Sequence, residues 1–309
     1  MPQANGDVWS PVITPFNADL APHTKRFVSH CQWLHSNGVG LAIFGTNSEA
    51  NSMSVVEKQA LLKALVDGGV DPARVMPGTG ACSIDDCVAL TQDAVTLGCA
   101  GVLMLPPFYY KGVSDEGLFR YFSQVINRID DSRLRIYLYH IPPVTQVPLS
   151  FDLIERLREA FPGIIAGIKD SGGDWAHTQA LVERFASDDF AVYAGSERFL
   201  LDTLRAGGAG CISATANVNP SAIIDVAQHW QQDDPDERQR RLNVIRDLFE
   251  KYPLIPAMKA ATAHFSGITD WQRVRPPLVE LDDQKASELI TLLHEAGFKM
   301  EGLDEAKHG

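Results

Sequence analysis

Lys169 is the side chain of this sequence best suited to covalent chemistry. It follows the apolar run of residues 164–168, which is typical of a short buried strand. Side chains alternate along a strand, so Gly167 shares a face with Lys169 and is expected to leave room beside the amine. An amine held away from bulk water gives up its proton more easily, and the neutral amine attacks carbonyl carbons. Lys169 is therefore either a Schiff-base nucleophile or a lysine that reaches solvent from a strand end.

Polar groups also stand at the ends of other apolar runs. Tyr139 ends the run of residues 134–139, where alternation puts Tyr137 and Tyr139 on one face and His140 on the other, toward the helices. A phenol near the amine can transfer protons during imine chemistry. Residues 45–49 read Gly-Thr-Asn-Ser-Glu, a polar turn whose backbone N–H groups suit a carboxylate or a phosphate. An ordinary connecting turn is the alternative for that segment.

Further polar and aromatic groups follow other runs. Tyr109 and Tyr110 come after two prolines, on a loop that either gates a site, crosses to another subunit or simply packs. A Gly-Thr-Gly fragment at residues 78–80 lacks the third glycine of a dinucleotide fingerprint, and the sequence has no serine-hydrolase elbow. Since no grouping of His, Asp and Glu in the sequence indicates a metal, we predict neither a metal nor a cofactor.

These residues stand at the ends of repeated strand-and-helix units. Eight apolar runs are predicted to be strands, near residues 8–14, 40–44, 74–78, 101–105, 134–139, 164–168, 190–194 and 210–213. A helical pattern follows each run, and Ser54 and Ser83 mark two helix starts. Eight such units predict an α/β fold, a (β/α)8 TIM barrel, with a doubly wound sheet as the alternative. In a barrel, catalytic groups lie at the C-terminal ends of the strands.

The last part of the chain has a different pattern. Three helical stretches follow, near residues 236–251, 255–265 and 283–296. We therefore predict a barrel over residues 1–233 and a C-terminal helical extension over residues 234–309.

Composition narrows the possible functions. The 309 residues carry 39 acidic and 27 basic side chains, and the net charge of -12 argues against nucleic acid or an anionic membrane as partner. The five cysteines lack zinc-binding spacing and fit reduced thiols. The start of the sequence does not resemble a signal peptide, and no apolar run approaches the roughly 20 residues of a membrane span. We therefore expect a cytoplasmic protein.

Taken in order along the chain, these motifs resemble the dihydrodipicolinate synthase and N-acetylneuraminate lyase family of pyruvate-handling class I aldolases. The resemblance covers nearly the whole chain and rests on one short motif at each of several strand ends. The motifs lie at residues 14–16, 45–49, 107–110, 139–142, 167–170 and 212–217.

The resemblance implies roles for individual residues. Lys169 matches the lysine that forms an imine with pyruvate or another 2-oxo acid. Tyr139 matches the tyrosine that relays protons to and from that imine, and Thr46 matches a hydroxyl in the same relay. The backbone N–H groups of Thr46 and Asn47 match the pair that holds the carboxylate of the 2-oxo acid.

The resemblance also implies an assembly and a wider binding site. Tyr109 or Tyr110 resembles the tyrosine that family members lend across a tight dimer interface, which implies a homo-oligomer, either a dimer or a homotetramer. Ile212 is similar to the residue whose carbonyl lies near the imine. Three further residues are placed by position to hydrogen-bond substrate hydroxyls: Ser171, Glu197 and Ser213.

Two departures from the family pattern bear on the substrate. The family turn usually reads Gly-Thr-Thr-Gly-Glu or Gly-Ser-Thr-Gly-Glu, whereas Asn47 here replaces a hydroxyl residue and Ser48 replaces a glycine. Dihydrodipicolinate synthases carry an arginine shortly after the tyrosine, where it holds the carboxylate of the second substrate. Val144 falls at that position and cannot make the bidentate contact. This favours a sugar-like or aldehyde-derived 2-oxo acid.

The expected activity is that of a Schiff-base-forming lyase or aldolase, acting on pyruvate or a longer 2-oxo acid. Three alternatives remain open. The first is dihydrodipicolinate synthase (4-hydroxy-tetrahydrodipicolinate synthase) of lysine biosynthesis, and the second is a 2-keto-3-deoxy sugar acid dehydratase. The third is a non-catalytic barrel that binds 2-oxo acids.

Overall fold

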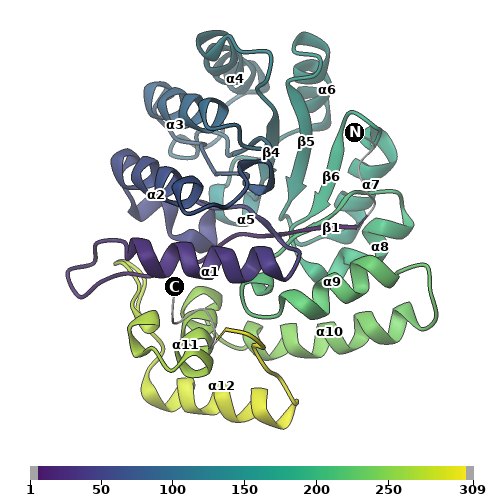
Figure 1. The fold of residues 1–309 in the computed structure, drawn as a ribbon. Helices are drawn as coiled ribbons and strands as arrows, with labels where there is room; N and C mark the ends of the chain where they lie inside the picture. Colours follow the sequence, from purple (N-terminus) through teal and green to yellow (C-terminus); the bar gives the residue numbers. More distant parts are fainter. Residues whose placement is uncertain (1–5, 304–309) are drawn as a thin grey trace.

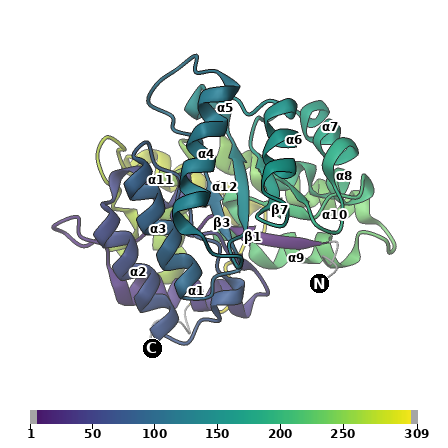
Figure 2. The same cartoon turned by 90° about the horizontal axis from the view of Figure 1, so that it is seen from above.

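The computed structural model describes residues 6–303 of the chain. Within them, parallel strands surround a central axis and helices cover the outside (Figures 1 and 2). In the sheet the strands follow the order β2-β1-β7-β6-β5-β4-β3. The strands are β1 (Asp7–Ser10), β2 (Gly40–Leu41), β3 (Val102–Met104), β4 (Ile136–His140), β5 (Ile165–Asp170), β6 (Ala191–Ala194) and β7 (Gly210–Ile212).

The sheet closes into a barrel through residues 75–78, where the sequence predicts a third strand. Single parallel bridges join this segment to Leu41 of β2 and to Leu103 of β3, the two edges of the open sheet. Pro77 lies inside the segment and has no N–H, so it interrupts the hydrogen-bond ladder. The predicted (β/α)8 barrel is confirmed, with its third strand reduced to isolated bridges.

Helices of the barrel follow the strands, and short 3₁₀ turns lie at several strand ends. The predicted capping box at Ser54 is present, with the Glu57 amide donating to the Ser54 hydroxyl at 3.2 Å. Ser83 caps the following helix in the same way. The helices are α1 (Thr24–Ser36), α2 (Val55–Asp67), α3 (Ile84–Thr96), α4 (Asp115–Ile129), α5 (Pro142–Thr145), α6 (Phe151–Ala160), α7 (Trp175–Phe185), α8 (Leu200–Arg205) and α9 (Pro220–His229). The 3₁₀ turns are η1 (Thr46–Ser48), η2 (Ala50–Ser52), η3 (Pro72–Arg74), η4 (Glu197–Phe199), η5 (Ala214–Asn217) and η6 (Thr269–Gln272).

Three more helices follow and pack along one side of the barrel (Figure 1). They are α10 (Pro235–Glu250), α11 (Leu254–Ser266) and α12 (Asp283–Glu295), each within one residue of its predicted ends. The predicted boundary after residue 233 falls in the loop between α9 and α10, where Asp234 has a left-handed φ of 57°. The division into two domains stays a proposal. Of the helices between residues 6 and 303, none has the length and apolar character that a bilayer crossing requires.

Aromatic rings fill the inside of the barrel below the strand ends. The rings of Tyr137 and Tyr193 lie 6.0 Å apart, and the Tyr193 hydroxyl donates to Asp7 at 3.4 Å. A Cβ added at Gly167 would lie 2.8 Å from the Tyr137 ring and 2.3 Å from a backbone carbonyl. The expectation that Gly167 leaves room beside the Lys169 amine is therefore wrong, because the Tyr137 ring fills that space.

Candidate active site

Strands β4 and β5 place Tyr139 and Lys169 side by side. The two residues are register partners in neighbouring parallel strands, so their side chains leave the sheet on one face and at one level. The Lys169 Nζ lies 4.3 Å from the centroid of the Tyr139 ring, and the two residues are only 2% and 3% exposed. The Tyr139 hydroxyl oxygen lies 3.4 Å from Thr46 Oγ1. Three residues from separate strand ends thus meet.

The surroundings of Tyr139 alter its acidity. Burial acts to raise the pKa of Tyr139, because a phenolate loses hydration inside the protein. The Lys169 ammonium and hydrogen bonds with Thr46, Lys169 and Ser171 outweigh burial and hold the pKa below its usual value. A phenol that ionises more easily is better suited to receive and return a proton near neutral pH.

A cavity of about 420 Å³ lies over these side chains. Because a barrel gathers the ends of all its strands at one rim, residues far apart in the sequence share the lining. Several lining residues were predicted from the sequence: Thr46, Asn47, Tyr139, Lys169 and Ser171.

The turn after β2 contains two unused backbone donors. In the described structure, the N–H groups of Thr46 and Asn47 have no acceptor, whereas those of Ser48 and Glu49 bond to carbonyls of the turn. The left-handed residues Phe44 (φ 60°) and Glu49 (φ 58°) bracket the turn, a conformation that costs about 1–3 kcal/mol for each residue that is not glycine. Two free N–H groups in one tight turn can bind a carboxylate.

Ser48 holds this strained turn against the first strand end. Its buried hydroxyl donates to the Val12 carbonyl and accepts from the Gly45 amide at 3.2 Å. The Thr14 hydroxyl donates to the Ser48 carbonyl at 2.9 Å. The serine that replaces the usual family glycine therefore has a structural role here, because its side chain bonds two parts of the backbone.

A buried ion pair holds the other end of the turn. The Lys259 ammonium on α11 donates to the Glu49 carboxylate, and both side chains are fully buried. The Arg275 amide donates to the second Glu49 oxygen at 2.7 Å. Burial lowers the pKa of Lys259 to about 8, although Glu49 acts to raise it. Sequence reasoning missed Lys259. The available signal was its position as the single lysine within the apolar helical stretch 254–263.

Three charged residues that sequence reasoning also missed line the same cavity. They are Arg198 of η4 and the α10 residues Arg246 and Glu250. The Glu250 carboxylate accepts from Arg246 Nε at 2.7 Å and from Arg198 Nε at 3.2 Å. In the sequence Arg246 and Glu250 are four residues apart on a helix, which is the spacing of an ordinary surface pair.

Three predicted binding residues are buried but do not line the cavity. The Glu197 carboxylate accepts hydrogen bonds from the Ser213 and Thr215 hydroxyls and from Arg246 Nη1, the last at 2.9 Å. Ile212 lies in β7 and is fully buried. Contacts of Glu197, Ile212 and Ser213 with substrate stay predictions.

The two loop tyrosines lie outside the cavity. Tyr109 and Tyr110 are 74% and 73% exposed, and their rings meet edge to face with centroids 5.3 Å apart. Lys111 ties their loop to α5 by donating to the Thr145 carbonyl at 2.7 Å. The predicted crossing of one tyrosine into another subunit stays a prediction.

The structure brings together one group of metal-ligand types that the sequence did not reveal: His140, Asp170 and His177. His140 Nδ1 accepts the Leu149 amide hydrogen at 3.1 Å, so the neutral ring carries its own hydrogen on Nε2. The Asp170 carboxylate bonds to His177 Nδ1 at 3.0 Å and accepts from the Thr178 hydroxyl at 2.7 Å. These bonds engage His140 Nδ1, His177 Nδ1 and one oxygen of Asp170. They fix Asp170, which directly follows the buried lysine.

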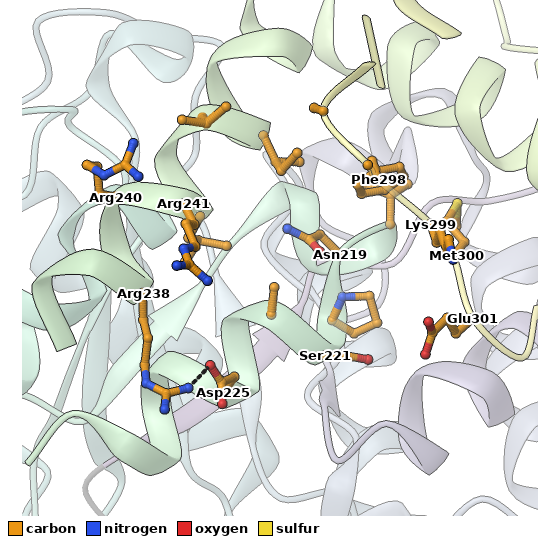
Figure 3. Close-up of a pocket in the computed structure, with 18 of the residues that line it drawn as sticks. Asn219, Ser221, Asp225, Arg238, Arg240, Arg241, Phe298, Lys299, Met300 and Glu301 are labelled. Carbon is orange, nitrogen blue, oxygen red and sulfur yellow. Dashed lines mark hydrogen bonds and ion pairs between the residues drawn. The ribbon is translucent and has the colours of Figure 1, made fainter. Parts of the chain in front are cut away.

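A second and larger cavity, of about 960 Å³, lies between α9, α10 and the chain after α12 (Figure 3). Arg238 there pairs with Asp225, and Arg240 and Arg241 both pair with Glu237. Its polar lining consists largely of partly exposed ion pairs, in contrast to the buried amine and phenol of the smaller cavity. We therefore take the smaller cavity as the candidate active site.

A closed α/β barrel with a buried lysine and tyrosine at its strand ends has the arrangement of a class I lyase or aldolase. Comparison with known proteins identifies the family. A family model described as the dihydrodipicolinate synthetase family matches residues 4–296, and the chain belongs to this family. The predicted family, fold class and enzyme class are confirmed.

Individual relatives agree with this assignment. A Chloroflexus aurantiacus protein named as an uncharacterized DapA-like lyase is 31% identical over 283 residues, covering 91% of this chain and 93% of the relative. Dihydrodipicolinate synthase from Agrobacterium tumefaciens superposes with a TM-score of 0.86 at 34% identity, covering 94% of this chain and 99% of that structure. Escherichia coli YagE, solved in complex with pyruvate, superposes with a TM-score of 0.85 at 27% identity, covering 94% and 98%.

Proposed function

We propose that this chain is a lyase or aldolase that binds pyruvate or a longer 2-oxo acid as a Schiff base on Lys169. The observation that carries the proposal is the position of the amine, 4.3 Å from the Tyr139 ring in a cavity of about 420 Å³. Burial lowers the pKa of two other lysines, Lys58 and Lys259, but neither residue lines this cavity. Position at a cavity beside a phenol, rather than burial alone, therefore distinguishes Lys169.

The proposed reaction begins with the neutral Lys169 amine adding to the keto carbon C2. Loss of water from the adduct forms the imine, whose protonated form accepts the electron pair of the C3–C4 bond as that bond breaks. Tyr139 takes the proton of the C4 hydroxyl, so that an aldehyde leaves, and a proton then returns to C3. Hydrolysis of the imine releases pyruvate and restores the amine. The reverse sequence is a condensation.

In this proposal the turn after β2 holds the substrate carboxylate. The free N–H groups of Thr46 and Asn47 support this role, since both residues line the cavity. The Thr46 hydroxyl, 3.4 Å from that of Tyr139, orients the phenol in the proton relay. The pyruvate complex of YagE supports a pyruvate-type substrate for this family member as well.

A sugar-like 2-oxo acid is the substrate class that we favour. Val144 on α5 is 59% exposed and does not line the cavity, so α5 supplies no cation for the carboxylate of a second substrate. YagE, 29% identical over 292 residues, is named as a putative 2-dehydro-3-deoxy-D-gluconate aldolase. Other relatives of similar identity are named 4-hydroxy-tetrahydrodipicolinate synthase, and Val144 is the observation that argues against that activity here.

We also propose that the chain forms a dimer or tetramer and works in the cytoplasm. Exposed apolar groups on neighbouring segments, Tyr109, Tyr110, Val113 and Val144, support an interface, because such patches commonly mark contact surfaces. The five cysteines are free thiols, a state that a reducing compartment preserves.

The test is reductive trapping. The protein is incubated with pyruvate and borohydride, and peptide mass mapping locates the adduct. We expect the adduct on Lys169 and its loss in Lys169→Met. Lys58→Met is the matched control, since Lys58 is another largely buried lysine away from the cavity and its removal should leave trapping intact. If neither pyruvate nor any longer 2-oxo acid labels Lys169, the proposed function is wrong.

A further inference from the structure

One wall of the active-site cavity is charged, and its residues lie outside the motifs at the strand ends. Arg198 follows β6, and Arg246 and Glu250 lie on α10, the first helix after the barrel. We call these three residues the arginine–glutamate wall. They lie outside all the motifs by which the chain resembles its family.

Carboxylates outnumber the arginines in this cluster. Glu250 bridges Arg198 and Arg246 through its two oxygens. Asp247 pairs with Arg198, and the fully buried Glu197 pairs with Arg246 at 2.9 Å. Two positive charges thus face three negative charges, and the formal sum is -1. A second anionic group on a substrate would meet this negative sum and would have to displace Glu250 from both arginines.

The wall nevertheless keeps unused hydrogen-bonding groups. An arginine has five N–H hydrogens in a fixed plane. Arg198 Nη1 and Arg246 Nη2 bond to no residue in the described part of the chain. Ser171 and Ser196 place hydroxyl-bearing residues on the same lining. The wall therefore offers donors and acceptors together while each of its arginines is already paired with two carboxylates, which is an environment that hydroxyl groups can satisfy.

We propose that the arginine–glutamate wall selects a 2-oxo acid whose far end is uncharged and carries hydroxyl groups, and rejects one whose far end is a carboxylate. This rests on the proposed function, because it concerns the far part of a substrate bound to Lys169. Glu250 is the specificity-determining residue, since it lines the cavity and its carboxylate bonds both arginines. The position of Val144 supplies no alternative cation for a distal acid.

The experiment compares two six-carbon 2-keto-3-deoxy sugar acids, one ending in CH₂OH and the other, the matched diacid, ending in a carboxylate. We expect the wild type to prefer the neutral-ended acid by about tenfold or more in kcat/KM, the scale of one unit charge at a partly exposed site. Glu250→Gln removes one negative charge and, from each arginine, one of its two carboxylate partners, so the preference should fall at least about fivefold.

Glu237→Gln is the matched control. Glu237 lies on the same helix and also pairs with two arginines, but it lies outside the active-site cavity, so its loss should leave the preference unchanged. Pyruvate trapping on Lys169 is measured in every variant. If trapping is intact and the wild type prefers the diacid, or Glu250→Gln keeps the wild-type preference, this inference is overturned while the proposed function stands. Absence of trapping in the wild type overturns both.

Discussion

Replacing Glu49 by glutamine tests how the C-terminal helices support the carboxylate turn. Glutamine has the shape of glutamate, but it cannot neutralise the buried Lys259 ammonium while also accepting from the Arg275 amide. Removing one partner of a buried ion pair costs about 3–5 kcal/mol. A chain of this length has an unfolding entropy of roughly 0.6 kcal/mol/K, so the Tm should fall by about 5–8 °C.

The loss should depend on pH, because burial lowers the pKa of Lys259 to about 8. Because pH 7 lies one unit below this pKa, the ammonium form is favoured over the neutral amine by about 1.4 kcal/mol. At pH 9 the lysine of the wild type has mostly lost its proton, so the wild type no longer has the ion pair either. Glu49 acts to raise the pKa of Lys259, so in Glu49→Gln burial holds that pKa lower still and less of the lysine is charged at pH 7. The stability gap should therefore widen as the pH falls below 8 and shrink by about 1 kcal/mol between pH 7 and pH 9.

Urea unfolding followed by circular dichroism at pH 7 and pH 9 measures this gap. Glu116→Gln is the surface control, because Glu116 also pairs with two arginines but is exposed. Its Tm should stay within about 2 °C of the wild type. The pyruvate concentration that half-saturates trapping should rise in Glu49→Gln, since the turn loses its anchor. No loss of stability at pH 7, or a loss of the same size at pH 9, would refute the reasoning.

Three further substitutions test the site. Tyr139→Phe should lower turnover about 10²–10⁴-fold while Lys169 still traps pyruvate, and full turnover would exclude Tyr139 from the proton relay. Ser48→Ala should lower the free energy of unfolding in urea by about 1–3 kcal/mol, because buried backbone groups lose their partner. It should also raise the pyruvate concentration that half-saturates trapping. An unchanged concentration would show that the turn keeps its shape without the Ser48 hydroxyl. The hydrogen bond to Asp170 raises the pKa of His177, so Asp170→Asn should lower that pKa. An NMR titration that finds the same pKa in wild type and variant would contradict the assigned bond.

Much of the fold was predictable because its signals are local. Helix starts such as Ser54 and Ser83 depend on a side chain and an amide three residues away. The strand ends could be read for the same reason, since alternation along β4 and β5 already puts Tyr139 and Lys169 on faces that can meet. The third strand was predicted as a full strand, whereas the structure has only isolated bridges there. The apolar run does not show that Pro77, which has no N–H, interrupts the hydrogen-bond ladder.

The parts that were missed depend on contacts between distant segments. Lys259 lies 210 residues after Glu49, and Arg246 lies 49 residues after Glu197. In sequence Arg246 and Glu250 have the spacing of a solvated helix pair. Only the packing of α10 against the barrel turns both side chains into the cavity wall.

The amino-acid sequence by itself thus determined the barrel, the family and the residues at the strand ends, because strand alternation and helix capping act over a few residues. The tertiary structure alone decided which charges surround them. It placed the C-terminal helices beside the rim of the barrel, and with them the ion pairs that hold the turn after β2 and line the far side of the cavity. Electrostatic partners are chosen by distance in space, and no local pattern along the chain records that distance.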